Sequence, residues 1–119
     1  PPRVLREVLS WRVEQTLVLP GGVLRARLAC GAGVRAALVS GALTVRGRQG
    51  GERIRPAGGR HSLSVKRLLQ EASLPPWERL QLPLILVGDV LLAVADLAVA
   101  ADAAAGPGET GLVFEYVRT

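Results

Sequence analysis

The sequence contains very few of the residues that form disulfides, metal sites and aromatic cores. Its single cysteine, Cys30, has no partner for an intramolecular disulfide, and one histidine, His61, leaves a zinc site without clustered ligands. Methionine is absent. The aromatic residues are Trp11, Trp77, Phe114 and Tyr116. A hydrophobic core must therefore be built mainly from leucine, valine and alanine, and no metal is expected in this chain.

A hydrophobic run long enough to cross a membrane is also missing. The most apolar stretch, residues 80–105, carries Asp89 and Asp96, and Asp102 lies near its end. An aspartate in the middle of a membrane helix costs about 2.5–3.5 kcal/mol. The N-terminus lacks the basic-then-apolar order of a secretory signal. With no disulfide to require an oxidising compartment, we expect a cytoplasmic protein without a membrane partner.

Sequence signatures of catalysis are absent. The glycine pairs at 50–51 and 58–59 are followed by Glu52 and Arg60, so neither fits the phosphate-binding pattern GxxxxGK[ST]. The nucleophile pattern GxSxG is missing as well. The aspartates at 89, 96 and 102 fall in expected turns and strands, where solvated positions are favoured over acid–base roles. We expect no catalytic residue and no cofactor in this chain.

The length and apolar content indicate one globular domain. The chain has 119 residues, of which 49% are hydrophobic. We expect residues 1–119 to form a single domain, with leading strands in 1–41 and the main body in 42–119. A chain that opens with Pro1-Pro2 rather than methionine suggests a piece of a longer protein.

Positive charge is abundant, and much of it lies in one stretch. Residues 46–67 hold seven of the fifteen basic side chains against one acid, Glu52, whereas residues 88–119 hold five acids and one base, Arg118. Such asymmetry favours a polyanion such as nucleic acid as the partner, over a merely solvated surface. The glycine pairs inside the stretch would make tight bends or let the backbone approach RNA closely.

Alternating apolar and polar residues predict the first strands. Residues 9–20 read as a strand that ends at Pro20-Gly21-Gly22, and residues 23–30 as a second strand that forms a hairpin with it. In the second strand, Arg25 and Arg27 are expected to face outward. The inward-facing set is Leu24, Ala26, Leu28 and Cys30.

The basic stretch is predicted to begin with two more extended pieces. Residues 42–49 alternate, with Leu43 and Val45 pointing inward. After the break at Gly50-Gly51, residues 52–56 form a short extended piece with Ile54 inward. The arginines expected to face solvent from these two pieces are Arg46, Arg48, Arg53 and Arg55.

The period then changes to that of a helix. An amphipathic helix is predicted at about 64–72, capped by Ser62 or Ser64 and ended by Pro75-Pro76. A short helix is predicted at about 75–80, with Trp77 filling the core. The apolar face of the longer helix is formed by Val65, Leu68, Leu69 and Ala72.

The last part of the chain is predicted to be strand. Two apolar strands flank a turn at Gly88-Asp89, and the alternation of residues 111–119 places Leu112, Phe114 and Tyr116 on one face. The expected fold is therefore α+β, with a mixed, mostly antiparallel sheet of about six strands, one longer helix and one short helix.

One long stretch also resembles a known family. Residues 43–99, LTVRGRQGGERIRPAGGRHSLSVKRLLQEASLPPWERLQLPLILVGDVLLAVADLAV, are similar to the C-terminal domain of bacterial tRNA(Ile)-lysidine synthetases. The PPWER turn after an LLQE helix carries most of this resemblance, and GETGLVFEYV is similar to the closing strand of that family. The resemblance implies a fold shared with the phenylalanyl-tRNA synthetase β subunit.

The resemblance also implies a role. In that family an N-terminal PP-loop domain with an SGGxDS signature uses ATP to ligate lysine to the wobble cytidine of isoleucine tRNA with a CAU anticodon. That signature is absent from this chain, so the chain itself is expected to be non-catalytic and to position the tRNA body beside the N-terminal catalytic domain. The residues expected to contact RNA are Arg46, Arg48, Arg53, Arg55, Arg60, His61, Lys66, Arg67 and Arg79.

Two other classes of function stay open from the residues alone. The same basic face would suit an acidic protein partner, a neighbouring domain of the same protein, or a homodimer formed through exposed strand edges. A small stand-alone enzyme is disfavoured, because no catalytic site can be assembled from the residues present.

Overall fold

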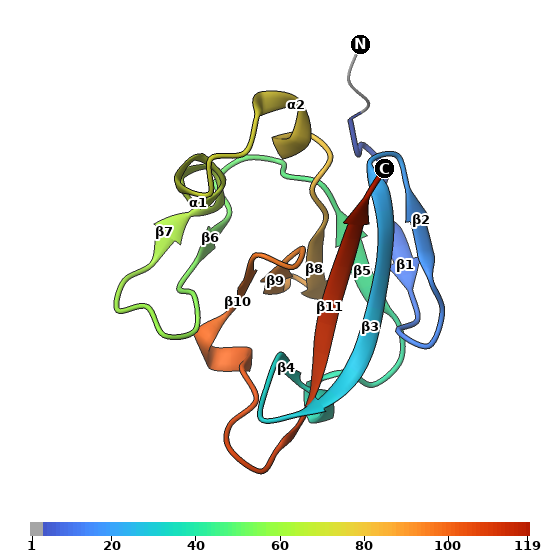
Figure 1. Cartoon of the computed structure of the whole chain (residues 1–119), viewed down its shortest axis with the longest axis vertical. Coiled ribbons are helices and arrows are strands. Elements are labelled where there is room, and N and C mark those ends of the chain that lie inside the picture. The colour runs from blue at the N-terminus through green and yellow to red at the C-terminus, as the bar shows by residue number, and fades with distance from the viewer. Residues whose placement is uncertain (1–3) are drawn as a thin grey trace.

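Residues 4–119 are described by a computed structural model, in which two antiparallel sheets pack face to face and a two-stranded hairpin stands beside them (Figure 1). The first sheet has the order β1-β5-β8-β9-β10, and the second has the order β2-β3-β11-β4. The opening Pro1-Pro2 lies outside the described residues. The strands are β1 Leu9–Trp11, β2 Leu17–Leu19, β3 Gly22–Cys30, β4 Val34–Arg35, β5 Leu43–Arg46, β6 Arg53–Ile54, β7 Leu63–Ser64, β8 Leu84–Val87, β9 Val90–Val94, β10 Ala98–Val99 and β11 Thr110–Arg118.

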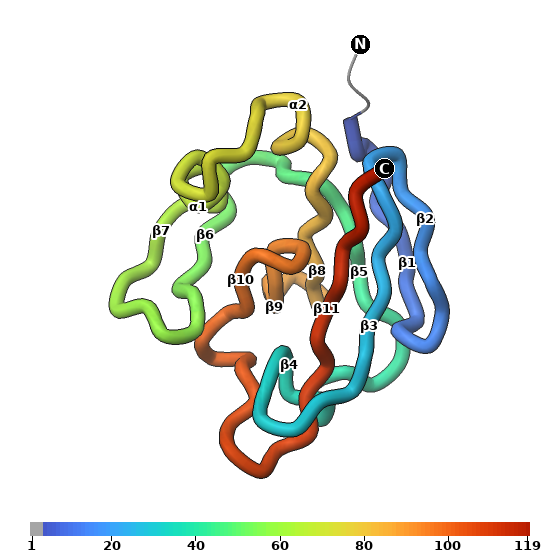
Figure 2. The backbone as a smooth tube through the Cα atoms, in the orientation of Figure 1, coloured from blue at the N-terminus to red at the C-terminus, as the bar shows by residue number. Residues whose placement is uncertain are grey.

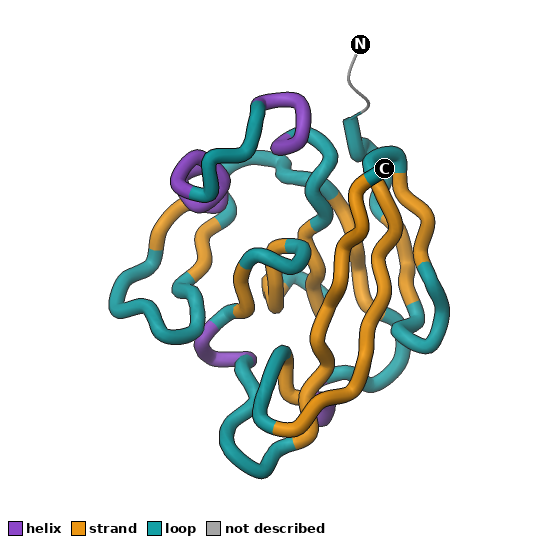
Figure 3. The backbone as a smooth tube through the Cα atoms, viewed as in Figure 1, coloured by secondary structure: helices purple, strands orange, loops and turns teal. Residues whose placement is uncertain are grey.

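Helices are few and short (Figure 3). The α-helices are α1 Val65–Glu71 and α2 Pro76–Arg79, and two single 3-10 turns are η1 Ala36–Leu38 and η2 Ala101–Ala103. The α+β class and the antiparallel sheets are confirmed. The described strands number more than the predicted six, partly because residues 9–20 hold two strands separated by a turn. None of the helices in residues 4–119 is long and apolar enough to cross a membrane.

The core lies between the two main sheets. The ring of Trp11 in β1 packs on the ring of Phe114 in β11, with ring centroids 5.6 Å apart. Leu112 and Tyr116 are buried beside Phe114, as the alternation of the last strand predicts. The hairpin of β2 and β3 across Pro20-Gly21 is also confirmed.

The predicted inward face of β3 is right at its start and wrong further along. Leu24 is fully buried, whereas Leu28 is 69% exposed and Cys30 is exposed. Strand β2 pairs only with Gly22–Leu24, so β3 becomes the edge of its sheet from Arg25 onward. Leu28 therefore has β11 on one side and no strand on the other.

Helix α1 forms where its sequence predicts. The backbone N–H of Arg67 donates to the Oγ of Ser64 (3.1 Å), so Ser64 rather than Ser62 caps the helix. Val65 and Leu69 are fully buried, while Leu68 is only half-buried. The helix ends at Glu71, and Ser73 has a positive φ of 58°.

The short helix α2 is confirmed, but the predicted burial of its tryptophan is wrong. Trp77 is 57% exposed, and its neighbour Leu80 is 41% exposed. Helix α2 is one four-residue turn on the surface, and Trp11 already fills the space between the sheets. The turn between β8 and β9 lies at Gly88-Asp89, as predicted.

Substitution of Leu69 tests how α1 is anchored. Because Leu69 is fully buried, Leu69→Ala should lower the free energy of unfolding by about 2–5 kcal/mol in urea denaturation. Leu28→Ala is the matched control, since Leu28 is 69% exposed, and it should change stability by less than about 0.5 kcal/mol. Equal effects of the two substitutions would contradict the burial of α1.

Candidate nucleic-acid interface

Most of the basic stretch folds into a separate two-stranded hairpin that is hydrogen-bonded to the segment after β10. Strands β6 and β7 pair through Arg53 with Ser64 and Ile54 with Leu63. The chain after β6 then bonds to the segment after β10: the N–H of Ala57 donates to the carbonyl of Val99, and that of Ala101 to the carbonyl of Arg55, both at 2.8 Å. The hairpin therefore stands at one side of the molecule, away from β2 and β3 (Figure 2).

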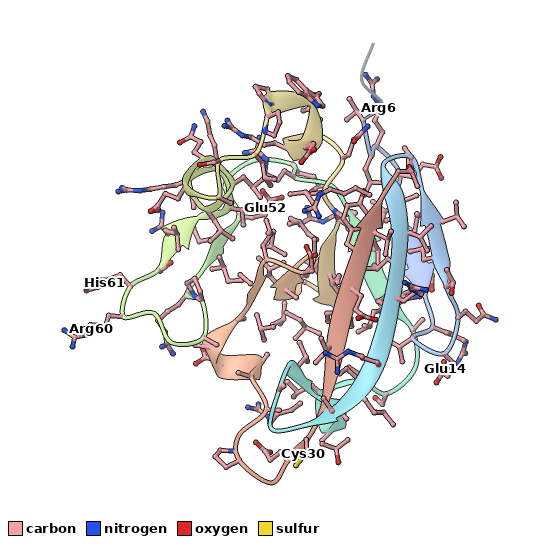
Figure 4. All side chains as sticks on the ribbon, in the orientation of Figure 1. Arg6, Glu14, Cys30, Glu52, Arg60 and His61 are labelled. Atoms are coloured by element: carbon pink, nitrogen blue, oxygen red, sulfur yellow. The ribbon has the colours of Figure 1, made fainter. Side chains whose placement is uncertain are left out.

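Six of the predicted contact residues share this hairpin and the first turn of α1. Ile54 is buried and faces the core, whereas the charged side chains are exposed. Figure 4 shows Arg60 and His61 at the tip of the hairpin loop, pointing away from the body of the molecule. We name the exposed set the basic hairpin surface: Arg53, Arg55, Arg60, His61, Lys66 and Arg67.

The cations of this surface are only partly engaged. Arg53 donates from Nε to the Oγ of Ser62 (3.2 Å) and from Nη2 to its carbonyl (3.1 Å). Arg55 pairs with Asp102 at 3.0 Å, and Arg67 with Glu71 at 3.8 Å. Such exposed pairs contribute little, typically about 0–1 kcal/mol. Within residues 4–119, Arg60 and Lys66 form neither an ion pair nor a side-chain hydrogen bond.

The other three predicted residues, Arg46, Arg48 and Arg79, are less exposed than the basic hairpin surface. The expectation that Arg46 and Arg48 face solvent is wrong, because both are half-buried. Only 17% of the Arg46 side chain is exposed, and its Nη1 donates to Glu52 at 2.7 Å. Arg79 is half-buried, and its Nε donates to the carbonyl of Leu74 at 2.7 Å, which ties α2 to the chain after α1.

Glu52 organises the loop between β5 and β6. Its carboxylate accepts hydrogen bonds from Arg46 (2.7 Å) and from the backbone N–H groups of Gln49 (2.7 Å) and Gly50 (3.0 Å). Burial alone raises the pKa of Glu52, but these hydrogen bonds outweigh it and lower the pKa to about 2. Gly50 and Gly51 have φ values of 104° and 84°, which other residues rarely adopt.

The charge pattern of the sequence identifies Glu52 only as the lone acid of a basic stretch. Its structural role is indicated by the glycine pair directly before it, because a tight bend there has backbone N–H groups that need an acceptor. Nowhere in the described part of the chain do three His, Cys, Asp or Glu side chains come together as a metal site.

Comparison with known proteins identifies the family. The family model described as the TilS substrate C-terminal domain matches residues 43–116. The chain belongs to this family. The match covers β5 to β11 and so includes the whole basic hairpin surface.

Individual relatives agree with this assignment. The tRNA(Ile)-lysidine synthase of Coxiella burnetii is 43% identical over 89 residues, covering 73% of this chain and 20% of that protein. The enzyme of the same name from Nitrosomonas europaea is 41% identical over 109 residues, covering 89% of this chain and 24% of that protein. The chain thus spans about a fifth to a quarter of the curated relatives it matches.

A solved structure confirms the fold. The crystal structure of a TilS C-terminal domain superposes with a TM-score of 0.73 at 25% sequence identity. The superposition covers 95% of this chain and 98% of that one.

The pH dependence of stability tests the role of Glu52. The pKa of Glu52 falls from 4.5 to about 2 on folding, and a shift of this size corresponds to roughly 3 kcal/mol. That stabilisation is complete above pH 4.5 and is lost as the pH falls towards 2. Glu52→Gln should therefore destabilise the protein strongly near pH 7, and the difference from wild type should shrink below pH 4.5.

The matched control is Glu14→Gln. Glu14 is an exposed carboxylate between β1 and β2, on the side of the molecule opposite the hairpin loop (Figure 4). Its replacement should change the free energy of unfolding at pH 7 by less than about 0.5 kcal/mol. Urea denaturation at several pH values measures the free energy of unfolding of both variants. If the difference between wild type and Glu52→Gln did not change with pH, the proposed stabilisation would be refuted.

Proposed function

We propose that this chain is the non-catalytic tRNA-binding domain of a tRNA(Ile)-lysidine synthase, and that the basic hairpin surface contacts the phosphates of the tRNA. The observation that carries the proposal is the exposure of five cationic side chains on one hairpin and one helical turn, at most weakly paired with acids. Arginine suits this task because its planar fork can bind a phosphate through two hydrogen bonds.

The shape of the surface supports recognition of structured RNA. A-form RNA presents phosphates and 2′-hydroxyls rather than a readable major groove, so contacts are made mainly with the backbone. The cations come from β6 and the residue after it, the hairpin loop and α1, and Arg60 on the loop points away from the body (Figure 4). Phosphates at several points along a stem could thus be contacted together.

The activity of the longer protein is inferred from its relatives. The matched proteins carry the name tRNA(Ile)-lysidine synthase, so we infer that ATP-dependent ligation of lysine to the wobble cytidine takes place in a part of the protein outside this chain. In this proposal ATP and lysine bind there, the protein works in the cytoplasm, and the present chain recognises and positions the tRNA body.

A second candidate function is contact with another domain of the same protein. It is favoured by α2, where Trp77 and Leu80 are both exposed. The backbone N–H of Leu5 donates to the carbonyl of Leu80 (3.1 Å), so the first described residues lie beside that patch. RNA binding and domain contact would use different surfaces, because the residues of the basic hairpin surface lie outside α2.

Charge removal with a matched control tests RNA binding. The triple variant Arg53→Gln, Arg60→Gln and Lys66→Gln removes three exposed cations that have no carboxylate partner in residues 4–119. Each phosphate contact changes the slope of log K against log salt by about 0.9 for duplex DNA. The triple variant should therefore weaken tRNA binding and flatten that slope by about 2–3, measured by fluorescence anisotropy.

The control removes the same charge elsewhere. The residues Arg6, Arg12 and Arg25 are exposed and lie on or before the first strands, and all three are changed to glutamine. This control variant should keep most of the wild-type affinity for tRNA and the wild-type slope of log K against log salt. Equal losses in both triple variants would assign binding to net charge alone, and an unchanged slope in the hairpin variant would refute the proposed surface.

A further inference from the structure

A depression beside the basic hairpin surface has an apolar floor, and its charged lining residues are three arginines and Asp102. It has a volume of about 430 Å³ and lies between β6, β9 and η2, which is within the range of small-molecule sites. Ile54, Leu92 and Ala103 are buried at its floor. The arginines that line it come from separate segments: Arg35, Arg53 and Arg55.

Each of these arginines is held in place and still has free donors. Arg35 donates from Nη1 to the carbonyl of Ala104 at 3.4 Å, Arg53 bonds to Ser62, and Arg55 bonds to Asp102. A guanidinium carries five N–H donors, and these contacts use one or two of them. The remaining donors can bind a phosphate, and the guanidinium planes can stack on a base.

The rim also exposes apolar surface that a ligand could cover. Val90, the first residue of β9, is 63% exposed and lines the depression together with half-buried Val87 and Leu91. The depression thus combines exposed apolar surface with three arginines and one carboxylate, Asp102, which is paired with Arg55. The net positive charge beside apolar surface suits a ligand with a flat apolar face and an attached anion. A nucleotide has both parts.

The depression is continuous with the basic hairpin surface. Arg53 and Arg55 belong to both, so an RNA backbone that follows the hairpin surface reaches the rim of the depression. The bases of an intact duplex are paired and stacked inside it. Only an unpaired nucleotide can therefore place its base on the apolar floor.

We propose that this depression binds one unpaired nucleotide of the RNA, with its base against Val90 and the apolar floor and its flanking phosphates on Arg53 and Arg55. The inference rests on the proposed function and adds a single-stranded element to what the domain recognises. It assigns a second task to two arginines of the basic hairpin surface.

The experiment compares two RNA hairpins with the same stem and the same number of phosphates. Both have four-residue single-stranded extensions at each end, and in one of them the extensions are abasic. The 119-residue chain should bind the base-containing RNA about five- to tenfold more tightly, because one face of the base is removed from water against the aliphatic lining. The ratio of the two dissociation constants isolates the base from the phosphates.

Val90→Glu tests whether the depression causes that preference. It places a carboxylate at the rim, and because Val90 is exposed the fold should be unaffected. Val18→Glu is the matched control: Val18 is 75% exposed on β2, in the other sheet, and its replacement adds the same charge. Val90→Glu should reduce the ratio to about one, while Val18→Glu should leave it at the wild-type value.

The outcomes separate this inference from the proposed function. Equal binding of both RNAs by wild type overturns the inference and leaves duplex binding intact, and the depression would then suit another ligand, such as an acidic peptide. Loss of the preference in both variants, or in neither, also overturns it. If neither RNA binds, the proposed RNA-binding function is contradicted, and so is the inference that rests on it.

Discussion

The carboxylate of Glu52 is the interaction on which the shape of the basic stretch depends. It binds the guanidinium of Arg46 at the end of β5 and two backbone N–H groups of the following loop. The carbonyl of the same residue accepts a hydrogen bond from the N–H of Val65 at the start of α1 (2.9 Å). One residue thus joins β5, the bend and the helix. The exposed cations of the hairpin are therefore not needed to hold these elements in place.

Features set by neighbours in the sequence could be predicted, and features set by distant partners could not. The Ser64 cap, the Gly88-Asp89 turn and the buried face of β11 depend on residues close in the chain. The burial of a tryptophan depends on the whole fold. Trp11 and Trp77 both have apolar neighbours in sequence, but only Trp11 meets Phe114 between the two sheets.

The candidate interface shows the same division. Arg46 and Arg53 both lie in short strands of the basic stretch, and the alternation of apolar and charged residues predicts an exposed side chain for each. The fold places Arg46 beside Glu52 with 17% of its side chain exposed, whereas Arg53 stays exposed beside Ser62. A count of bases in a stretch therefore overstates how many can reach a phosphate, because some of them neutralise the acid that shapes the loop.

The short ladder of the hairpin has a consequence for how order is distributed in the molecule. Strands β3 and β11 pair over nine residue positions, whereas β6 and β7 pair over two. Local opening requires less free energy where fewer hydrogen bonds and buried contacts must be broken. The amide hydrogens of the hairpin should then exchange with solvent well before those of β3 and β11. A ligand on the hairpin would slow that exchange selectively, and the ordering of this one element would become part of the free energy of binding.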